Sequence, residues 1–116
     1  MFNSNMYGFG EIDPNGLFKL LENGEVALID VRGAGELAHG VIEGARHVPL
    51  HLLPLRAHEM DKDIPHVYYC RSGARSAQAC AFMAGQGHGK SFNLQGGIIA
   101  WVQSGLGLAK AATGNG

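Results

Sequence analysis

The stretch that decides how this chain of 116 residues folds is Tyr68-Tyr69-Cys70-Arg71-Ser72-Gly73-Ala74-Arg75-Ser76. Just before it, residues 64–69 form a short β-branched and aromatic run, which predicts a buried strand. Just after it, apolar side chains recur at helical spacing, at Ala77, Cys80, Ala81 and Ala84. Cys70 is therefore expected where a strand ends and a tight loop leads into a helix.

The loop that follows Cys70 has the features of an anion site. A turn from a strand into a helix directs successive backbone N–H groups inward and adds the positive end of a helix dipole. Arg71 and Arg75 add two full charges, although they are also compatible with a solvated surface. Such surroundings lower the pKa of a thiol and attract an anion, so Cys70 is a candidate nucleophile. The alternative is a small buried side chain with no chemical role.

The second cysteine has a different setting. Cys80 lies on the apolar face of the predicted helix and has no basic neighbour in the sequence. We expect it to be a buried structural residue. A disulfide between Cys70 and Cys80 is not expected, because Cys80 lies well inside the helix and faces the core.

Composition describes an ordinary globular chain, with 46% hydrophobic and 16% charged residues. A formal net charge of −1 gives no global field for nucleic acid or a membrane surface. The N-terminus has no signal-like pattern, no apolar run approaches membrane-spanning length, and two unlike cysteines do not form a disulfide framework. We therefore expect a cytoplasmic protein with no nucleic-acid or membrane partner.

The order of predicted elements favours a single α/β domain. Helical segments alternate with strand candidates at residues 26–31, 45–48 and 92–94. We expect an irregular N-terminal lead-in over residues 1–10, a domain over residues 11–108, and a flexible tail without packing partners over residues 109–116. Ligands of such sheets collect at the carboxyl ends of the strands, where Cys70 is predicted to lie.

Other motif matches are weaker. The glycine-rich stretch 84–91 resembles a phosphate loop, but a helix precedes it and a strand candidate follows, which is the reverse of the order required. Residues 33–38 resemble a dinucleotide fingerprint without its second acidic strand end. The histidines have no metal-ligand spacing and are expected at the surface: His39, His47, His51, His58, His66 and His88. We expect no metal and no cofactor.

Taken together, four segments resemble the single-domain rhodanese family, also called thiosulfate sulfurtransferase-like. The likeness runs from about Ile12 to Leu108. The segments are Leu28-Ile29-Asp30-Val31-Arg32, the Gly-x-Ile-x-Gly-Ala-x-x-x-Pro pattern at 40–49, the loop from Cys70 to Arg75, and Gly96-Gly97-Ile98-Ile99-Ala100-Trp101. Val41 stands where the family often has His. The resemblance implies a three-layer sandwich around a mostly parallel sheet of about five strands.

The resemblance also implies a sulfurtransferase that carries sulfur as a Cys70 persulfide. A sulfane-sulfur donor such as thiosulfate would supply the sulfur, and cyanide, a cellular thiol or a partner protein would accept it. Substrate-binding roles are expected for the loop residues Arg71, Ser72, Gly73, Ala74 and Arg75. Asp30 and Arg32 are expected to order this loop, and Trp101 to anchor the core.

Two alternatives to sulfur transfer remain at this point. Cysteine phosphatases and arsenate reductases grip an oxyanion with a similar loop, but their pattern has one residue more than the four that separate Cys70 from Arg75. A shorter ring suits a single sulfur atom. A non-catalytic rhodanese-like binding module is the second alternative, and such modules usually lack the cysteine. The sequence names neither the physiological donor nor the acceptor.

Overall fold

The computed structural model describes residues 3–4 and 8–111. Within these residues, strands form a sheet in the order β1-β2-β6-β5-β3-β4. All neighbouring strands are parallel except β1 and β2, which are antiparallel. The strands are β1 (Asn3–Ser4), β2 (Gly10–Ile12), β3 (Ala27–Asp30), β4 (Arg46–His47), β5 (His66–Tyr69) and β6 (Ser91–Leu94). The prediction of a mostly parallel sheet of about five strands is confirmed.

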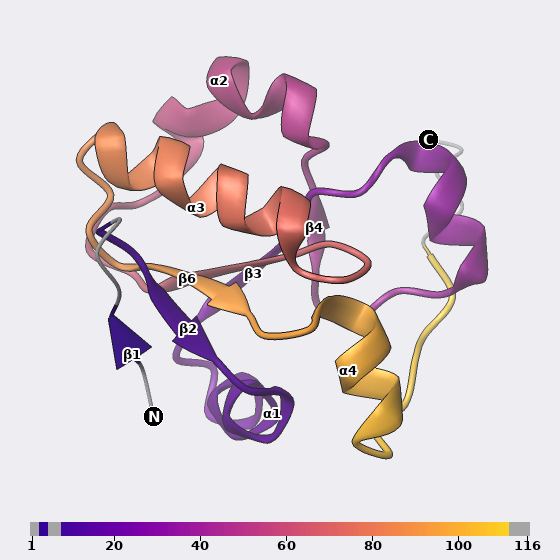
Figure 1. The fold of residues 1–116 in the computed structure, drawn as a ribbon. Helices are drawn as coiled ribbons and strands as arrows, with labels where there is room; N and C mark the ends of the chain where they lie inside the picture. The colour runs from indigo at the N-terminus through magenta and orange to yellow at the C-terminus, as the bar shows by residue number, and fades with distance from the viewer. Residues whose placement is uncertain (1–2, 5–7, 112–116) are drawn as a thin grey trace.

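Helical segments cover both faces of the sheet, which confirms the three-layer α/β sandwich. Helices α2 and α3 lie on one face, and α1 and α4 lie on the other (Figure 1). The α-helices are α1 (Pro14–Glu22), α2 (Leu53–Arg56), α3 (Ala74–Gly85) and α4 (Gly97–Gln103). The short 3-10 segments are η1 (Ala34–His39), η2 (Leu50–Leu52) and η3 (Ala57–Glu59).

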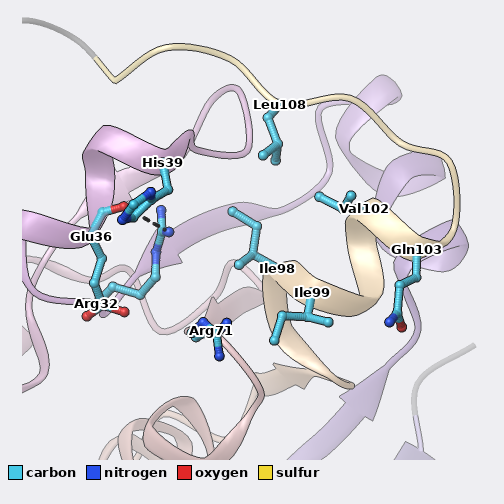
Figure 2. Close-up of a pocket in the computed structure, with 9 residues that line it drawn as sticks. All are labelled: Arg32, Glu36, His39, Arg71, Ile98, Ile99, Val102, Gln103 and Leu108. Atoms are coloured by element: carbon cyan, nitrogen blue, oxygen red, sulfur yellow. Dashed lines mark hydrogen bonds between the residues drawn. The ribbon is translucent and has the colours of Figure 1, made fainter.

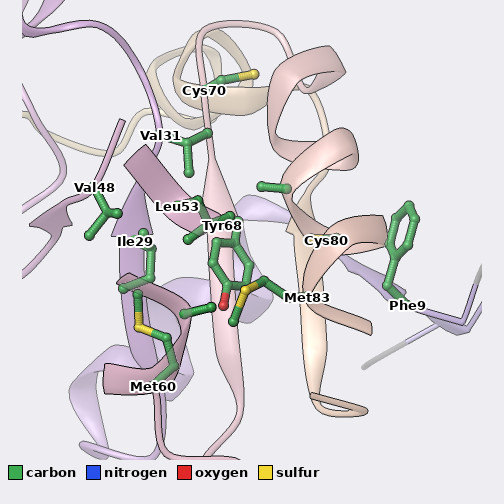
Figure 3. Packing of buried hydrophobic residues seen from close by; sticks show 12 residues of the cluster. Phe9, Ile29, Val31, Val48, Leu53, Met60, Tyr68, Cys70, Cys80 and Met83 are labelled. Carbon is green, nitrogen blue, oxygen red and sulfur yellow. The ribbon is translucent and has the colours of Figure 1, made fainter. Parts of the chain in front are cut away.

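Strand β5 lies between β6 and β3, and all four of its residues are buried. Its side chains alternate between two apolar clusters, as the pleat of a strand requires. Tyr68 packs with Ile29, Met83 and other side chains against α3 (Figure 3). Tyr69 belongs to the opposite cluster, with Leu17 and with Trp101, which is buried as expected. The carboxyl end of β5 is therefore held from both sides.

Local signals explain where several elements begin and end. The Asp13 carboxylate caps α1 by accepting a hydrogen bond from the Gly16 N–H at 2.7 Å, and Pro14 occupies the first helical position. The glycine-rich stretch 84–91 is the turn from α3 into β6, which confirms that it is not a phosphate loop. Phe92 and Leu94 lie in that strand.

The structure corrects the prediction at both ends of the domain. β1 and β2 extend the sheet where an irregular lead-in was expected, and Phe9 is buried in the α3-side cluster. Ala109 exchanges backbone hydrogen bonds of 2.8 and 2.9 Å with Val41, so the first residue of the expected tail is paired. Residues 112–116 of that tail lie outside the described residues.

Two histidines are buried rather than exposed. His66 and His88 are each 6% exposed. The His66 ring stacks on Tyr68, and its Nδ1 lies 2.7 Å from the Ile64 carbonyl oxygen. The polar ring can therefore be buried in the central strand, because its nitrogen has a hydrogen-bond partner there. Burial, assisted by the nearby Lys62 charge, lowers the pKa of His88. No helix among the described residues is long and apolar enough to cross a bilayer.

Candidate active site

Cys70 follows β5 directly, and α3 begins four residues later, as the sequence predicted. The Cys70 side chain lies at the N-terminal end of α3 (Figure 3). Its Sγ accepts hydrogen bonds from the Gly73 N–H at 3.1 Å and the Ser76 N–H at 3.4 Å. The Ser76 hydroxyl oxygen also lies 3.4 Å from this sulfur. Gly73 has a φ of +107°, which lets the loop turn so that its N–H faces the sulfur.

These contacts favour the ionised form of the thiol. Burial alone would raise the pKa of Cys70, but hydrogen bonds from Ser76, Gly73 and Ser72 outweigh it and lower the pKa below the ordinary value for cysteine. Cys80 shows the reverse. Burial raises its pKa, and the side chain is fully enclosed among apolar neighbours. Both cysteines are free thiols.

The two arginines of the loop have different surroundings. Arg75 forms a two-pronged ion pair with Glu36 of η1, with N–O distances of 2.6 and 2.8 Å. This pair lowers the pKa of Glu36 to about 2. The Arg71 side chain is exposed, and no ion pair with it is found among the described residues. Of these two arginines, Arg71 therefore presents the uncompensated charge beside the loop.

Asp30 and Arg32 form a buried ion pair at the carboxyl end of β3, with 2.8 Å between Nη2 and Oδ2. Arg32 also donates to the Gly40 carbonyl at 2.9 Å, which ties it to the end of η1. The Tyr69 hydroxyl donates to Asp30 at 2.8 Å, and burial followed by the Asp30 charge raises the pKa of that tyrosine. Neither residue of the pair hydrogen-bonds the Cys70 loop directly.

Helix α4 holds the backbone of the loop. The Ile98 N–H donates to the Cys70 carbonyl at 3.0 Å, and the Ile99 N–H donates to the Arg71 carbonyl at 3.2 Å. Gly97 makes this approach possible, because a Cβ on it would lie 2.4 Å from the Arg71 carbonyl oxygen. Its φ of +62° also favours glycine. Gly97, the first residue of α4, is therefore required for close contact with the loop, whereas a Cβ on Gly96 would meet Ala100.

A pocket of about 410 Å³ opens beside Arg71 (Figure 2). Helix α4 provides most of its apolar wall through Ile98, Ile99 and Val102. Leu108 completes the wall from the segment that follows α4. Val102 and Leu108 are 49% and 42% exposed, so part of this apolar wall is open to solvent. The pocket thus combines an apolar surface with a cation at its border.

Three contributors to the site were missed by sequence reasoning. Glu36 and Arg75 are 39 positions apart, so only the fold brings them together. Ser76 lies in the first turn of the predicted helix. A hydroxyl at that position can point toward the same atom as the first N–H groups of the helix, which here is the Cys70 sulfur. Asn93 lies in β6 beside β5 and bonds the Ser76 hydroxyl. A polar residue inside an otherwise apolar strand candidate was the available signal for Asn93.

Comparison with known proteins identifies the family. The Rhodanese-like domain family matches residues 13–104, and the chain belongs to this family. The chain is 50% identical over 97 residues to a sulfurtransferase from Allochromatium vinosum, covering 83% of this chain and 91% of that protein. It is 35% identical over 96 residues to thiosulfate sulfurtransferase GlpE from Ectopseudomonas mendocina, covering 83% of this chain and 87% of that protein.

Solved structures agree with the sequence comparison. The crystal structure of a rhodanese-related protein from Thermoplasma volcanium matches with a TM-score of 0.79 at 25% identity, covering 87% of this chain and 98% of that chain. A rhodanese-like domain protein from Staphylococcus aureus matches with a TM-score of 0.78 at 28% identity, covering 88% of this chain and 98% of that chain. The protein is a sulfurtransferase homologous to thiosulfate sulfurtransferases, and the phosphatase, arsenate reductase and binding-module alternatives are set aside.

The environments of the two thiols predict selective alkylation. In the folded protein, iodoacetamide should modify Cys70 with a pH–rate midpoint below that of free cysteine, because the lowered pKa leaves more thiolate at neutral pH. Cys80 should react far more slowly, because burial among apolar side chains raises its pKa. Exposure does not separate the two thiols, since Cys70 is 1% and Cys80 0% exposed. Mass spectrometry of the two cysteine-containing peptides measures both rates. Protein unfolded in urea should label at both positions, and equal labelling of the folded protein would contradict the assignment.

Proposed function

We propose that Cys70 is the nucleophile of this sulfurtransferase and carries sulfur as a persulfide between a thiosulfate-like donor and a thiol acceptor. The observation that supports this proposal most directly is the ring of donors around Cys70 Sγ, at 3.1 Å from Gly73 N and 3.4 Å from Ser76 N. Preorganised N–H groups stabilise an anionic sulfur without a neighbouring base. The homology to thiosulfate sulfurtransferases supports the choice of donor.

The proposed reaction has two balanced steps. In the first, the Cys70 thiolate attacks the outer sulfur of thiosulfate, a new S–S bond forms, and sulfite leaves with the electron pair of the broken S–S bond. In the second, a thiolate or cyanide attacks the outer sulfur of the persulfide, and Cys70 departs as a thiolate. The N–H groups of Ser72, Gly73 and Ser76 are the donors that would stabilise the negative sulfur in both states.

The first prediction concerns the persulfide. Protein treated with thiosulfate should gain one sulfur atom, about 32 Da, because the proposed intermediate retains it covalently. Intact-mass spectrometry measures the gain, and cyanide or a reductant should reverse it. Cys70→Ser should gain no mass, whereas Cys80→Ser is the matched control and should behave as the parent. A mass gain that disappears with Cys80→Ser would show that the wrong thiol was chosen.

The second prediction separates the two arginines. We propose that Arg71 attracts the sulfonate end of the donor, since its charge is not compensated by a neighbour. Arg71→Ala should lower kcat/KM for thiosulfate by roughly tenfold or more, as expected for loss of a charge-assisted contact in the transition state. Arg75→Ala should have a smaller effect, because Glu36 already neutralises Arg75. Steady-state kinetics with cyanide as the acceptor measures both variants.

The control for this comparison is Glu36→Gln, which keeps the size of the side chain and removes its charge. Glu36→Gln is combined with Arg71→Ala, and kcat/KM for thiosulfate is compared with that of Arg71→Ala alone. If Arg75 only pairs with Glu36 in the parent, the double variant should keep the defect of Arg71→Ala or recover part of the lost kcat/KM, because Arg75 is then free to attract the donor. A larger loss in Arg75→Ala than in Arg71→Ala would show instead that Arg75 leaves Glu36 to bind the donor.

The apolar pocket beside Arg71 supports a thiol with a carbon chain as the acceptor. Its wall is connected to the sulfur site, because Ile98 and Ile99 of the wall donate to the backbone of Cys70 and Arg71. A chain placed against Ile99 and Val102 would be removed from water and gain binding energy in proportion to the area covered. Cyanide is too small to use this surface.

The third prediction tests this acceptor class by chain length. Mercaptohexanol should exceed mercaptoethanol in kcat/KM by roughly tenfold, because its additional methylene groups can be partly buried in the pocket. Val102→Asp should abolish most of this advantage and leave turnover with cyanide unchanged. Ser104→Asp adds the same charge just beyond α4 and outside the pocket lining, and should preserve the preference. Equal use of the two thiols by the parent protein would contradict the acceptor class.

A further inference from the structure

A chain of polar side chains connects Cys70 to the neighbouring strand β6. The Ser76 hydroxyl oxygen lies 2.6 Å from Asn93 Oδ1 and 3.4 Å from Cys70 Sγ. Ser76 is fully buried and Asn93 is 5% exposed. The distance to Asn93 is that of a strong O–H···O hydrogen bond, whereas the distance to sulfur is an ordinary one for the larger and weaker sulfur acceptor. Of its two partners, Asn93 is thus the closer one to the Ser76 hydroxyl.

The orientation of the Asn93 amide is determined by its other neighbours. Its Nδ2 group donates to the Gly73 carbonyl at 3.2 Å and to the Glu11 carboxylate at 3.4 Å. A carbonyl can only accept a hydrogen bond, so the nitrogen must face Gly73 and the oxygen must face Ser76. Asn93 Oδ1 is therefore a fixed acceptor, and the proton between it and Ser76 belongs to the serine.

A serine hydroxyl has one proton, which cannot serve Asn93 and Cys70 in full at the same time. When the hydroxyl donates to Asn93, its lone pairs face the sulfur and suit a protonated thiol. When Cys70 is a thiolate, the same lone pairs would face a negative charge. The hydroxyl must then rotate and donate to sulfur, which breaks the short bond to Asn93.

We propose that Asn93 is a positioning residue that competes with the Cys70 thiolate for the Ser76 proton and thereby sets how readily the thiolate forms. The inference rests on the proposed role of Cys70 as nucleophile and assigns the tuning of that nucleophile to a residue outside the Cys70 loop. Ser76 donates to Asn93 in the resting thiol and to the sulfur in the thiolate. The fixed amide opposes ionisation, while the N–H groups of Gly73 and Ser76 favour it.

Other ionisable groups surround the loop and influence the same titration. Beyond the compensated Asp30, they are Glu11 on β2, Arg32 after β3, Glu36 in η1, His51 in η2, Arg71 in the loop and Arg75 in α3. Asn93→Leu removes the hydrogen bond from Asn93 Nδ2 to the Glu11 carboxylate, but it does so equally in both Ser76 backgrounds. Among the described residues, the other groups make no side-chain hydrogen bond with Ser76 or Asn93. Their contributions therefore cancel when the two positions are compared in a double-mutant cycle.

The experiment measures the pH–rate midpoint of Cys70 alkylation by iodoacetamide in four proteins: the parent, Ser76→Ala, Asn93→Leu and the double variant. Ser76→Ala should move the midpoint to higher pH by about one pH unit, because the thiolate loses a donor. Asn93→Leu should move it to lower pH when Ser76 is present, because the hydroxyl is then free to donate to sulfur. In the Ser76→Ala background, Asn93→Leu should bring no such decrease.

The alternative is that Asn93 only holds the loop through the Gly73 carbonyl. Asn93→Leu would then move the midpoint to higher pH, or leave it in place, equally in both backgrounds, and that result would overturn the proposal. An unchanged midpoint in Ser76→Ala would overturn it as well, because the hydroxyl would then never serve the thiolate. The matched control is Gln95→Leu, an exposed amide just beyond β6, which should leave the midpoint unchanged.

The result can be separated from failure of a variant to fold and from failure of the persulfide proposal. Circular dichroism and thermal unfolding identify variants that do not fold, and Asn93→Ala replaces Asn93→Leu if the larger side chain is not accommodated. Ser76→Ala alone still decides whether the hydroxyl serves the thiolate. No sulfur donor is used, so failure of persulfide formation would leave the titration result intact. Loss of the coupling would equally leave the persulfide assignment standing.

Discussion

Asp30 places a negative charge in the interior at the carboxyl end of β3, and the surrounding backbone is arranged to satisfy it. Arg32 donates to this carboxylate from its side chain and from its N–H, and the Tyr69 hydroxyl donates at 2.8 Å. Tyr69 in turn accepts from the Ile42 N–H at 3.1 Å. Removing one member of a buried pair leaves an uncompensated charge, at a cost of about 3–5 kcal/mol. The end of β5 and the segment after η1 are positioned by this one group.

The consequences reach the sulfur site through two routes. Tyr69 immediately precedes Cys70, so the contact with Asp30 fixes the point at which the strand ends. Arg32 bonds the carbonyls of Glu36 and Gly40, which holds η1 in place. Glu36 can then bind Arg75 in the first turn of α3. Because that pair is neutral overall, stabilisation of the Cys70 thiolate comes from the hydrogen bonds of the Ser76 hydroxyl and of nearby N–H groups.

Much of this arrangement is encoded locally and could be predicted. The strand, loop and helix around Cys70 follow from an apolar run, a glycine and helical periodicity, all within roughly twenty residues. Asp30 and Arg32 were recognised because they are two residues apart at a strand end. Strand β2 was missed because it has only three residues, one of them glycine. The contacts of Glu36 and Asn93 depend on which strands become neighbours, and local patterns carry no information about that order.

Cys70 lies between the helices on the two faces of the sheet. Helix α3 can therefore influence ionisation of the sulfur, while α4 can influence the approach of an acceptor. The Cys70 sulfur faces α3 and packs with the α3-side cluster, while the Cys70 carbonyl is bound by α4. Sulfur ionisation therefore responds to the first turn of α3 and to Asn93 behind it. In the proposed reaction, access for a larger acceptor would depend on α4, whose apolar residues line the open pocket. Since Gly97 locks α4 against the loop, the two layers remain in register, and substitutions on the exposed side of α4 can alter acceptor choice without displacing the donors that hold the sulfur.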